Sequence, residues 1–214
     1  MDVSIIIFYK ENRGWLDECI KAAQDQVFNG EFEIIIQQGN YGASKNYNDG
    51  IKKAKGKYIR GCAEDDLLMP NCIQDLYDFA ESGNYDIVCA NAYNMRNGSN
   101  ELYKSVIPQT ISMLAEQNTI HGGTTMYKKQ SIVDINLFNE SLWTGEEFDL
   151  MLRMADNGYK FGYINKEVFY YRIWDGMKSM QAAIYSGEEY LKRKRYIRDV
   201  IRMKYLNNHK VIKR

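Results

Sequence analysis

Two adjacent carboxylates, Asp65 and Asp66, follow a short apolar segment in the turn Ala63-Glu64-Asp65-Asp66. Like charges at neighbouring positions repel each other, so a fold that keeps them must compensate with solvent, a helix N-terminus or a bound cation. Pro70 begins a predicted helix soon afterwards, so one interpretation of the pair is helix capping. The other interpretation is a site for Mg²⁺ or Mn²⁺, because both ions prefer carboxylate oxygens.

These acids follow the third strand in a predicted alternation of strands and helices. The continuous apolar run at 3–9 is typical of a strand buried on both faces, and apolar residues then recur at helical spacing over 16–27. The alternation continues with predicted strands at 32–36, 58–62 and 85–90 and predicted helices at 43–54 and 70–80. Such a chain forms an α/β domain with a mostly parallel sheet, and its polar loops at 8–12, 37–42 and 63–67 should line one crevice.

The second half of the sequence is less regular. We expect a loop over 91–107, helices over 108–117 and 146–157, strands over 159–164 and 167–171, and a basic helix near the C-terminus. Neither an internal repeat nor a Pro/Gly/Ser-rich linker divides the sequence. We therefore expect one domain, with residues 1–187 as its body and a basic helix and tail at 188–214 as part of it.

Charge is distributed unevenly along the chain. Its 214 residues hold 28 basic and 28 acidic side chains, yet residues 188–214 carry a net charge of +7 and the remainder −7. An acidic body argues against nucleic acid as a partner, because phosphate binding needs a broad basic surface. The basic helix either packs on the domain through an apolar stripe or makes a peripheral contact with anionic membrane lipid. The stripe consists of Tyr190, Ile197, Val200, Ile201 and Tyr205.

The apolar segments and the cysteines indicate where the protein resides. No apolar stretch approaches the roughly 20 residues that span a bilayer, and no basic segment precedes the first strand. We therefore expect neither a transmembrane helix nor a signal peptide. The four cysteines lack metal-ligand spacing, which predicts small buried thiols in a reducing cytoplasm.

Six landmarks occur in order along the chain. They are Ser4–Ile7 with Leu16–Ile20, Phe32–Ile36, Asn48–Ile51 with Ala54–Ile59, Asp65–Pro70, Gly123–Tyr127, and Gly145–Leu150 with Arg153–Ala155. Together they resemble the inverting sugar transferases of glycosyltransferase family 2. The resemblance implies a GT-A fold, a three-layer α/β/α sandwich around a mixed, mostly parallel sheet. It also implies a hexosyltransferase that moves a sugar, with inversion, from a nucleoside diphosphate to a hydroxyl of a glycan or lipid-linked acceptor.

The resemblance further implies that Mn²⁺ or Mg²⁺ neutralises the departing diphosphate. The family's Asp-x-Asp pattern aligns with Ala63-Glu64-Asp65, so Asp65 and its neighbour Asp66 are the expected metal ligands, and Glu64 is an expected donor contact. A histidine that is often near the metal in the family is replaced by Trp174, and Asp175 is its expected substitute.

A second acidic pair, Glu146 and Glu147, begins the helix predicted at 146–157. A carboxylate at a helix N-terminus commonly only compensates the helix dipole. In the family that this chain resembles, an acidic pair at this place supplies the general base that removes the proton of the acceptor hydroxyl. We assign the base to Glu147, with Glu146 as the alternative.

The remaining expected site residues also follow from the resemblance. Where the family has acids that bind the nucleotide base, this chain has Gln37 and Gln38, whose amides can both accept and donate hydrogen bonds. The other expected donor contacts are Phe8, Tyr9, Gly42, Asn48, Arg172 and Lys178. His121, Gly123 and Thr124 are expected to border the acceptor.

Two alternative functions stay open at this point. The loss of acids at 37, 38 and 63 would suit an inactive sugar-nucleotide-binding module, but a decayed site has no reason to retain both Asp65 and the glutamate pair. A nucleotidylyltransferase would share the α/β crevice, but it needs a Gly-rich, Arg-containing loop after the first strand, which residues 8–13 do not provide.

Overall fold

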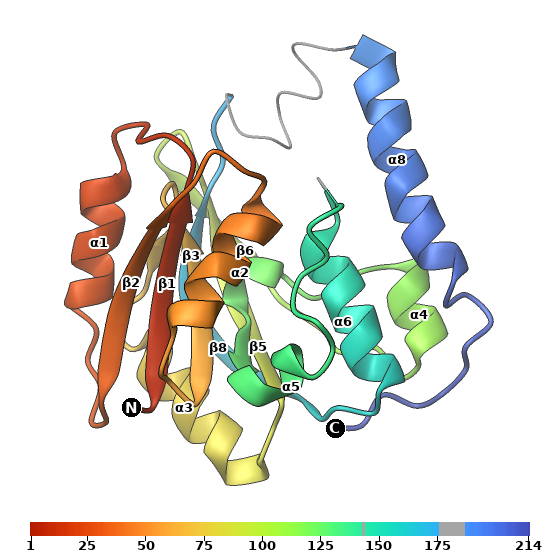
Figure 1. The fold of residues 1–214 in the computed structure, drawn as a ribbon, viewed down its shortest axis with the longest axis horizontal. Helices are drawn as coiled ribbons and strands as arrows, with labels where there is room; N and C mark the ends of the chain where they lie inside the picture. Colours follow the sequence, from red (N-terminus) through yellow and green to blue (C-terminus); the bar gives the residue numbers. More distant parts are fainter. Residues whose placement is uncertain (143, 176–186) are drawn as a thin grey trace.

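A mixed sheet runs through the centre of the computed structural model, which describes residues 1–142, 144–175 and 187–214 (Figure 1). Its strand order is β2-β1-β3-β7-β5-β8-β4, with β6 paired to β5. The strands are β1 (Val3–Tyr9), β2 (Phe32–Gln38), β3 (Tyr58–Ala63), β4 (Leu67–Leu68), β5 (Ile87–Arg96), β6 (Ser99–Tyr103), β7 (Met126–Lys128) and β8 (Phe161–Arg172). The helices are α1 (Leu16–Gln24), α2 (Ala43–Lys53), α3 (Cys72–Gly83), α4 (Ile111–Glu116), the 3₁₀ turn η1 (Gly122–Thr124), α5 (Lys129–Val133), α6 (Glu146–Asp156) and α8 (Gly187–Met203).

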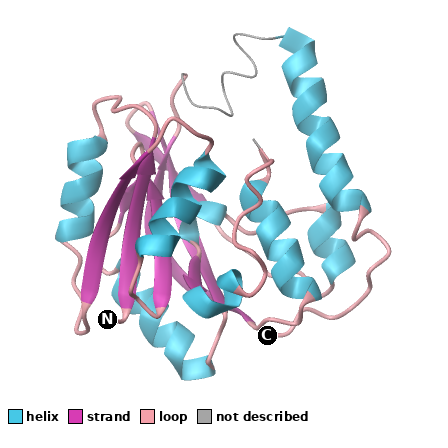
Figure 2. Ribbon diagram, in the orientation of Figure 1, coloured by secondary structure: helices cyan, strands magenta, loops and turns pink. Residues whose placement is uncertain are grey.

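Helices cover both faces of the sheet, because the side chains of a strand alternate between its two faces (Figure 2). In β1, Ile5 and Ile7 belong to the apolar cluster that includes residues of α1 and α3. Ile6 belongs to a second cluster, which includes residues of α2, α4 and α6. This arrangement is the three-layer α/β/α sandwich that the sequence predicts.

Parallel pairing aligns the ends of three strands at one edge of the sheet. β1 pairs in parallel with both β2 and β3, and its residue Phe8 is in register with Gln37 on one side and Ala63 on the other. The loops that follow these strands therefore leave the sheet together. Segments far apart in sequence therefore meet at one end of the sheet, although only the loops at 8–12 and 63–67 supply residues to the cleft described below, and 37–42 does not.

The second half departs from the sequence prediction in several places. The segment expected as a loop over 91–107 forms the end of β5 and the hairpin strand β6. The two strands expected over 159–164 and 167–171 form a single strand, β8, which pairs with β5 through a register shift near Asn91. The short elements β4, β7 and α5 were not predicted, because so few residues carry no periodic signal of their own.

The C-terminal helix and tail pack on the body of the domain. Ile201 of α8 is 2% exposed and belongs to the same cluster as Ile6, whereas Val200, expected in the same stripe, is 42% exposed. The tail returns to the body through Phe161 N–H, which donates to Lys213 O, and Ile212 N–H, which donates to Gln109 O. One face of α8 is therefore buried against the domain, as the packing interpretation predicts. Another face is exposed, so the interpretation of α8 as a membrane contact stays open.

Two further expectations concern membranes and thiols. Within the described ranges, every helix is too short or too polar to cross a membrane. All four cysteines are free and buried, which confirms the prediction of small buried thiols.

Candidate active site

A cleft of about 480 Å³ lies at the strand ends, bordered by η1 and by the beginning of α6. Seven of the residues predicted from the sequence line it, namely Phe8, Asp65, Asp66, His121, Gly123, Glu146 and Glu147. The structure thus brings the acids that follow β3 together with the acids that begin α6, although about 80 residues separate them in the chain.

The two acids after β3 have different environments. Asp66 is 6% exposed, and its Oδ1 accepts a hydrogen bond of 2.9 Å from the backbone N–H of Arg172. Burial, and then the charge of Asp65, raises the pKa of Asp66 well above its ordinary value, which favours its neutral form. Asp65 is only partly buried, and its Oδ2 accepts a hydrogen bond of 2.9 Å from Trp174 Nε1. Asp65 is therefore the better candidate for binding a cation.

The other acids expected near the metal do not join Asp65. Glu64 is 3% exposed and pairs with Arg13 Nη1 at 2.6 Å, and burial nevertheless raises its pKa. Asp175 is exposed and is absent from the cleft lining. Across the described part of the chain, no three His, Cys, Asp or Glu side chains converge on one point. Asp65 is the carboxylate here that could act as a ligand of Mn²⁺ or Mg²⁺, and diphosphate oxygens and water would have to supply the other ligands.

The acids that begin α6 also differ from each other. Glu146 is 8% exposed, whereas Glu147 is exposed at the cleft. Glu147 packs directly on η1, because a Cβ atom added to Gly122 would lie 2.8 Å from Glu147 Cγ. Glycine at 122 therefore allows α6 and η1 to approach closely, with the Glu147 side chain against the Gly122 backbone.

The floor of the cleft contains a buried charge that the sequence analysis missed. Arg60, 1% exposed, lies in β3 and donates hydrogen bonds to the carbonyl groups of Gly61, Gly123 and Thr125. The hydroxyl groups of Tyr47 and Tyr127 are also buried beside the cleft, and that of Tyr47 has no hydrogen-bond partner among the described residues. The sequence did hold a signal for Arg60, namely an arginine within a strand predicted to be buried. A buried guanidinium requires specific hydrogen-bond partners, so this position could have been singled out.

His121 lines the cleft among aromatic rings. Its ring centroid lies 5.2 Å from that of Tyr103, 6.0 Å from that of Phe169 and 5.0 Å from that of Tyr171. Its Nδ1 accepts a hydrogen bond of 3.1 Å from Gly123 N–H, which assigns the proton of the neutral ring to Nε2. Burial, and then the charge of Arg60, lowers the pKa of His121 to about 4. At neutral pH this ring is a hydrogen-bond donor rather than a cation.

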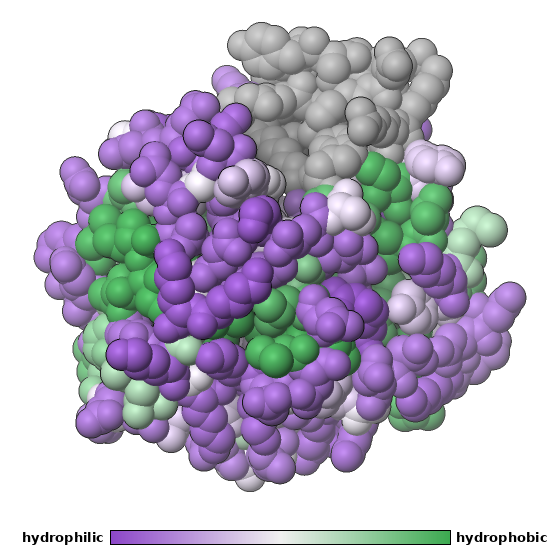
Figure 3. Space-filling model, viewed as in Figure 1, coloured by the Kyte–Doolittle hydropathy of each residue, from purple (hydrophilic) through white to green (hydrophobic). Residues whose placement is uncertain are grey.

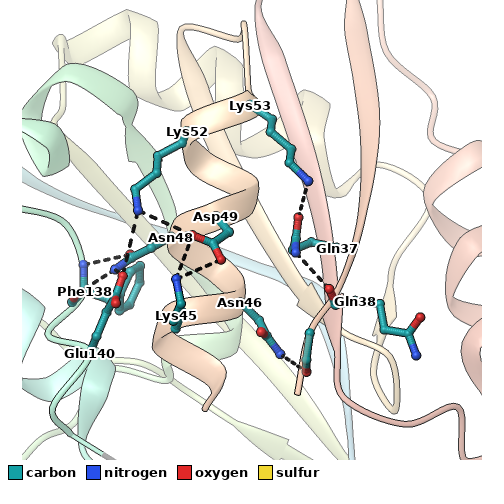
Figure 4. A network of polar contacts seen from close by, with 11 residues as sticks. Gln37, Gln38, Lys45, Asn46, Asn48, Asp49, Lys52, Lys53, Phe138 and Glu140 are labelled. Carbon is teal, nitrogen blue, oxygen red and sulfur yellow. Dashed lines mark hydrogen bonds and ion pairs between the residues drawn. The ribbon is translucent and has the colours of Figure 1, made fainter. Parts of the chain in front are cut away.

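Gln37 and Asn48, both expected at the donor pocket, have other partners (Figure 4). Gln37 contacts α2, and Asn48, which lies in α2, contacts the segment before α6. Gln37 Oε1 accepts a hydrogen bond of 2.6 Å from Lys53, and its amide donates to Gln38 O. Asn48 is 2% exposed and bonds both backbone groups of Phe138, at 2.9 and 3.1 Å. Gln37, Gln38 and Asn48 are absent from the cleft lining, which corrects the place that we predicted for them.

The remaining predicted residues lie at or beyond the margins of the cleft. Gly42 precedes α2 as its N-cap, and the backbone carbonyl of Tyr9 accepts a hydrogen bond from Asn46. Arg172 forms an ion pair with Glu18, with Nη2 2.8 Å from Oε2, and its Nε donates a hydrogen bond to the backbone carbonyl of Asp65. Thr124 is fully buried and bonds backbone groups through its hydroxyl. Lys178 lies outside the described residues.

Comparison with known proteins identifies the family. The family model described as Glycosyl transferase family 2 matches residues 28–134, which is half of the chain. The chain belongs to glycosyl transferase family 2. The fold of this family 2 chain is similar to that of residues 1–349 of S. aureus TarS, solved in complex with UDP-GlcNAc, with a TM-score of 0.70. The sequences are 18% identical, and the match covers 97% of this chain and 72% of that chain, which supports the GT-A fold.

Relatives of this family 2 chain include bacterial proteins named for glycosyl transfer and for teichoic acid biosynthesis. The chain is 29% identical over 158 residues to the glycosyltransferase GlyG of Streptococcus pneumoniae serotype 4, a match that covers 67% of this chain and 52% of GlyG. It is 25% identical over 158 residues to the minor teichoic acid biosynthesis protein GgaB of Bacillus subtilis, with 70% of this chain and 17% of GgaB covered. The chain therefore spans about half the length of GlyG and a smaller part of GgaB.

The lowered pKa of His121 predicts a pH-dependent stability. An unfolded histidine binds a proton below about pH 6.5, whereas folded His121 does so only near pH 4. Between these values the unfolded state binds more protons, so the free energy of unfolding falls as the pH is lowered, by about 3 kcal/mol in total. Urea unfolding of the wild type and of His121→Asn at pH 7 and pH 4.5 measures this loss, which should be smaller in the variant. Equal losses in the two proteins would contradict the lowered pKa.

Proposed function

We propose that this chain transfers a hexose-type sugar from a nucleoside diphosphate to an acceptor hydroxyl, with inversion at the anomeric carbon. The observation that carries the proposal is that Asp65 and Glu147 line the same cleft. The TarS complex with UDP-GlcNAc supports a UDP-sugar as the donor. GgaB, a teichoic acid biosynthesis protein, supports a role in glycan or cell-surface polymer biosynthesis.

In this mechanism, Glu147 is the general base. Its carboxylate accepts the proton of the acceptor hydroxyl as the hydroxyl oxygen forms a bond to the anomeric carbon. The bond from that carbon to the diphosphate oxygen breaks on the opposite face, and the electron pair leaves with the diphosphate. His121 donates a hydrogen bond to the substrate through Nε2–H, and the rings of Tyr103 and Tyr171 form the adjoining wall.

Asp65 is the residue that would hold Mn²⁺ or Mg²⁺ in this cleft. Trp174 Nε1 orients the carboxylate through Oδ2, and Oδ1 has no hydrogen-bond partner among the described residues. When bound, the metal neutralises charge on the departing diphosphate.

The alternative function, an inactive sugar-nucleotide-binding module, predicts that no sugar is transferred. The presence of both Asp65 and Glu147 at one cleft favours an enzyme over this alternative.

We also propose that the protein is cytoplasmic and contacts the membrane peripherally through α8. Tyr196, Val200 and Met203 follow helical spacing and are 68%, 42% and 71% exposed, on a helix whose Ile201 is buried. Apolar surface is visible along the described part of α8 (Figure 3). An exposed apolar stripe flanked by arginine side chains is typical of a helix that lies at a lipid interface.

Replacing Asp65 by Asn should remove the metal dependence of donor binding. The amide retains an oxygen that can accept from Trp174 but loses the negative charge, so the affinity for UDP should no longer increase when Mn²⁺ is added. Calorimetric titration of UDP with and without Mn²⁺ measures this, and Asp25→Asn in an exposed ion pair serves as the control. A metal-dependent gain that persists in Asp65→Asn would refute the assignment.

Replacing Glu147 by Gln should lower kcat by about 10² to 10⁴ while the KM for the donor changes little, because the amide cannot accept the proton. Glu146→Gln, at the more buried position, should have a smaller effect. Steady-state transfer from UDP-GlcNAc to a panel of glycan acceptors gives both constants. The reverse ranking of the two variants would move the base to Glu146.

The exposed face of α8 should bind anionic vesicles in a salt-sensitive way. The double variant Tyr196→Ser/Met203→Ser should bind less, and the exposed control Val27→Ser should bind like the wild type. Sedimentation with vesicles rich in phosphatidylglycerol at low and high salt tests this. Truncation before α8 is unsuitable, because it would remove the buried residues Ile201 and Ile212. Absence of salt-sensitive binding by the wild type would exclude the membrane role.

A further inference from the structure

Arg198 of α8 lines the cleft beside the beginning of α6. Its side chain is exposed and makes no hydrogen bond or ion pair with any residue in the described ranges. By contrast, Arg172 near the same cleft is paired with Glu18, and Arg202 one turn further along α8 lies 3.7 Å from Asp199. A guanidinium at the cleft that has no partner among the residues the structure describes is available to an anionic ligand.

Packing of α8 on α6 determines where Arg198 lies. A Cβ atom added to Gly145 would be 3.4 Å from Ile201 Cδ1 and 3.8 Å from Arg198 Cγ, so α8 packs directly on the backbone at that point. Gly145 has a φ of +75°, a conformation that favours glycine, and it immediately precedes Glu146. Buried Ile201 anchors this part of α8 in the core. Arg198 is therefore held beside the acids that begin α6.

The position of Arg198 indicates which substrate it contacts. In an inverting displacement, the acceptor approaches the face of the sugar opposite the leaving diphosphate, and the general base contacts the acceptor. A cation next to Glu146 and Glu147 therefore lies on the acceptor side of the cleft. This step depends on the proposed transferase function, which assigns the base to α6.

We propose that Arg198 binds a phosphate group of the acceptor, so that the enzyme selects acceptors that carry phosphate near the reacting hydroxyl. Guanidinium groups match phosphate well, because two parallel N–H groups donate to two phosphate oxygens. The phosphate has two chemical sources, a phosphodiester within a polymer and the diphosphate of a lipid-linked sugar. Both present the same group to Arg198.

The test compares Arg198→Gln with the wild type in binding experiments that need no turnover. The full chain, loaded with UDP and Mn²⁺, is titrated with poly(glycerol phosphate), with farnesyl-diphosphate-linked GlcNAc in detergent, and with a neutral oligosaccharide of matched length. We expect the variant to lose about tenfold or more in affinity for at least one of the phosphate-bearing ligands. The ligand that loses affinity identifies the source of the phosphate. Affinity for UDP and for the neutral ligand should not change.

Lys204→Gln is the matched control, because it removes one exposed positive charge just after α8 and away from the cleft lining. This control should bind both phosphate-bearing ligands like the wild type. Unchanged affinity of Arg198→Gln for both ligands would overturn the proposal, and a loss restricted to UDP would assign Arg198 to the donor diphosphate instead. A loss seen only with anionic vesicles would assign it to the membrane. A failure of the transferase proposal gives a different result, because the wild-type protein would then bind no nucleoside diphosphate.

Discussion

The buried guanidinium of Arg60 is the interaction on which the geometry of the cleft depends. It joins the end of β3 to η1 by donating to the carbonyl groups of Gly61, Gly123 and Thr125. A charge in this position is tolerated because carbonyl dipoles replace the water that it loses. Its field contributes to the low pKa of His121 and so keeps that ring neutral. One side chain thus holds η1 against β3 and, after burial, helps to lower the pKa of His121, the N-cap of η1.

Burial separates the members of each acidic pair. All four acids line the cleft, but Asp66 and Glu146 are at most 8% exposed, whereas Asp65 and Glu147 are more open to it. Neighbouring residues in a turn or helix point in different directions, about 100° apart in an α-helix, so two adjacent acids cannot both face one ligand in the same way. In each pair that looks redundant in sequence, one carboxylate is buried and the other is open to the cleft.

Sequence patterns predicted most elements of the fold, but they predicted the position of only some of the site residues, for a physical reason. Long apolar runs and helical spacing depend on local residues, so β1 and α6 could be located from them. The partners of Gln37 and Asn48 could not, because Lys53 and Phe138 are brought to them only by tertiary packing. The same holds for Asp65 and Asp66, whose difference in burial arises where β8 ends against their turn.

The two proposed ends of the cleft come from different parts of the chain. The matched family segment, 28–134, contains Asp65 and His121 but ends before α6 and α8. The proposed diphosphate end of the cleft therefore lies within the matched segment, and the proposed base and Arg198 lie outside that segment. The acceptor side is nevertheless held firmly, because Ile201 is buried and the tail bonds to β8 and to the segment before α4. Changes on the packed surface of α8 can therefore alter the acceptor side while the sheet and the turn that carries Asp65 remain the same.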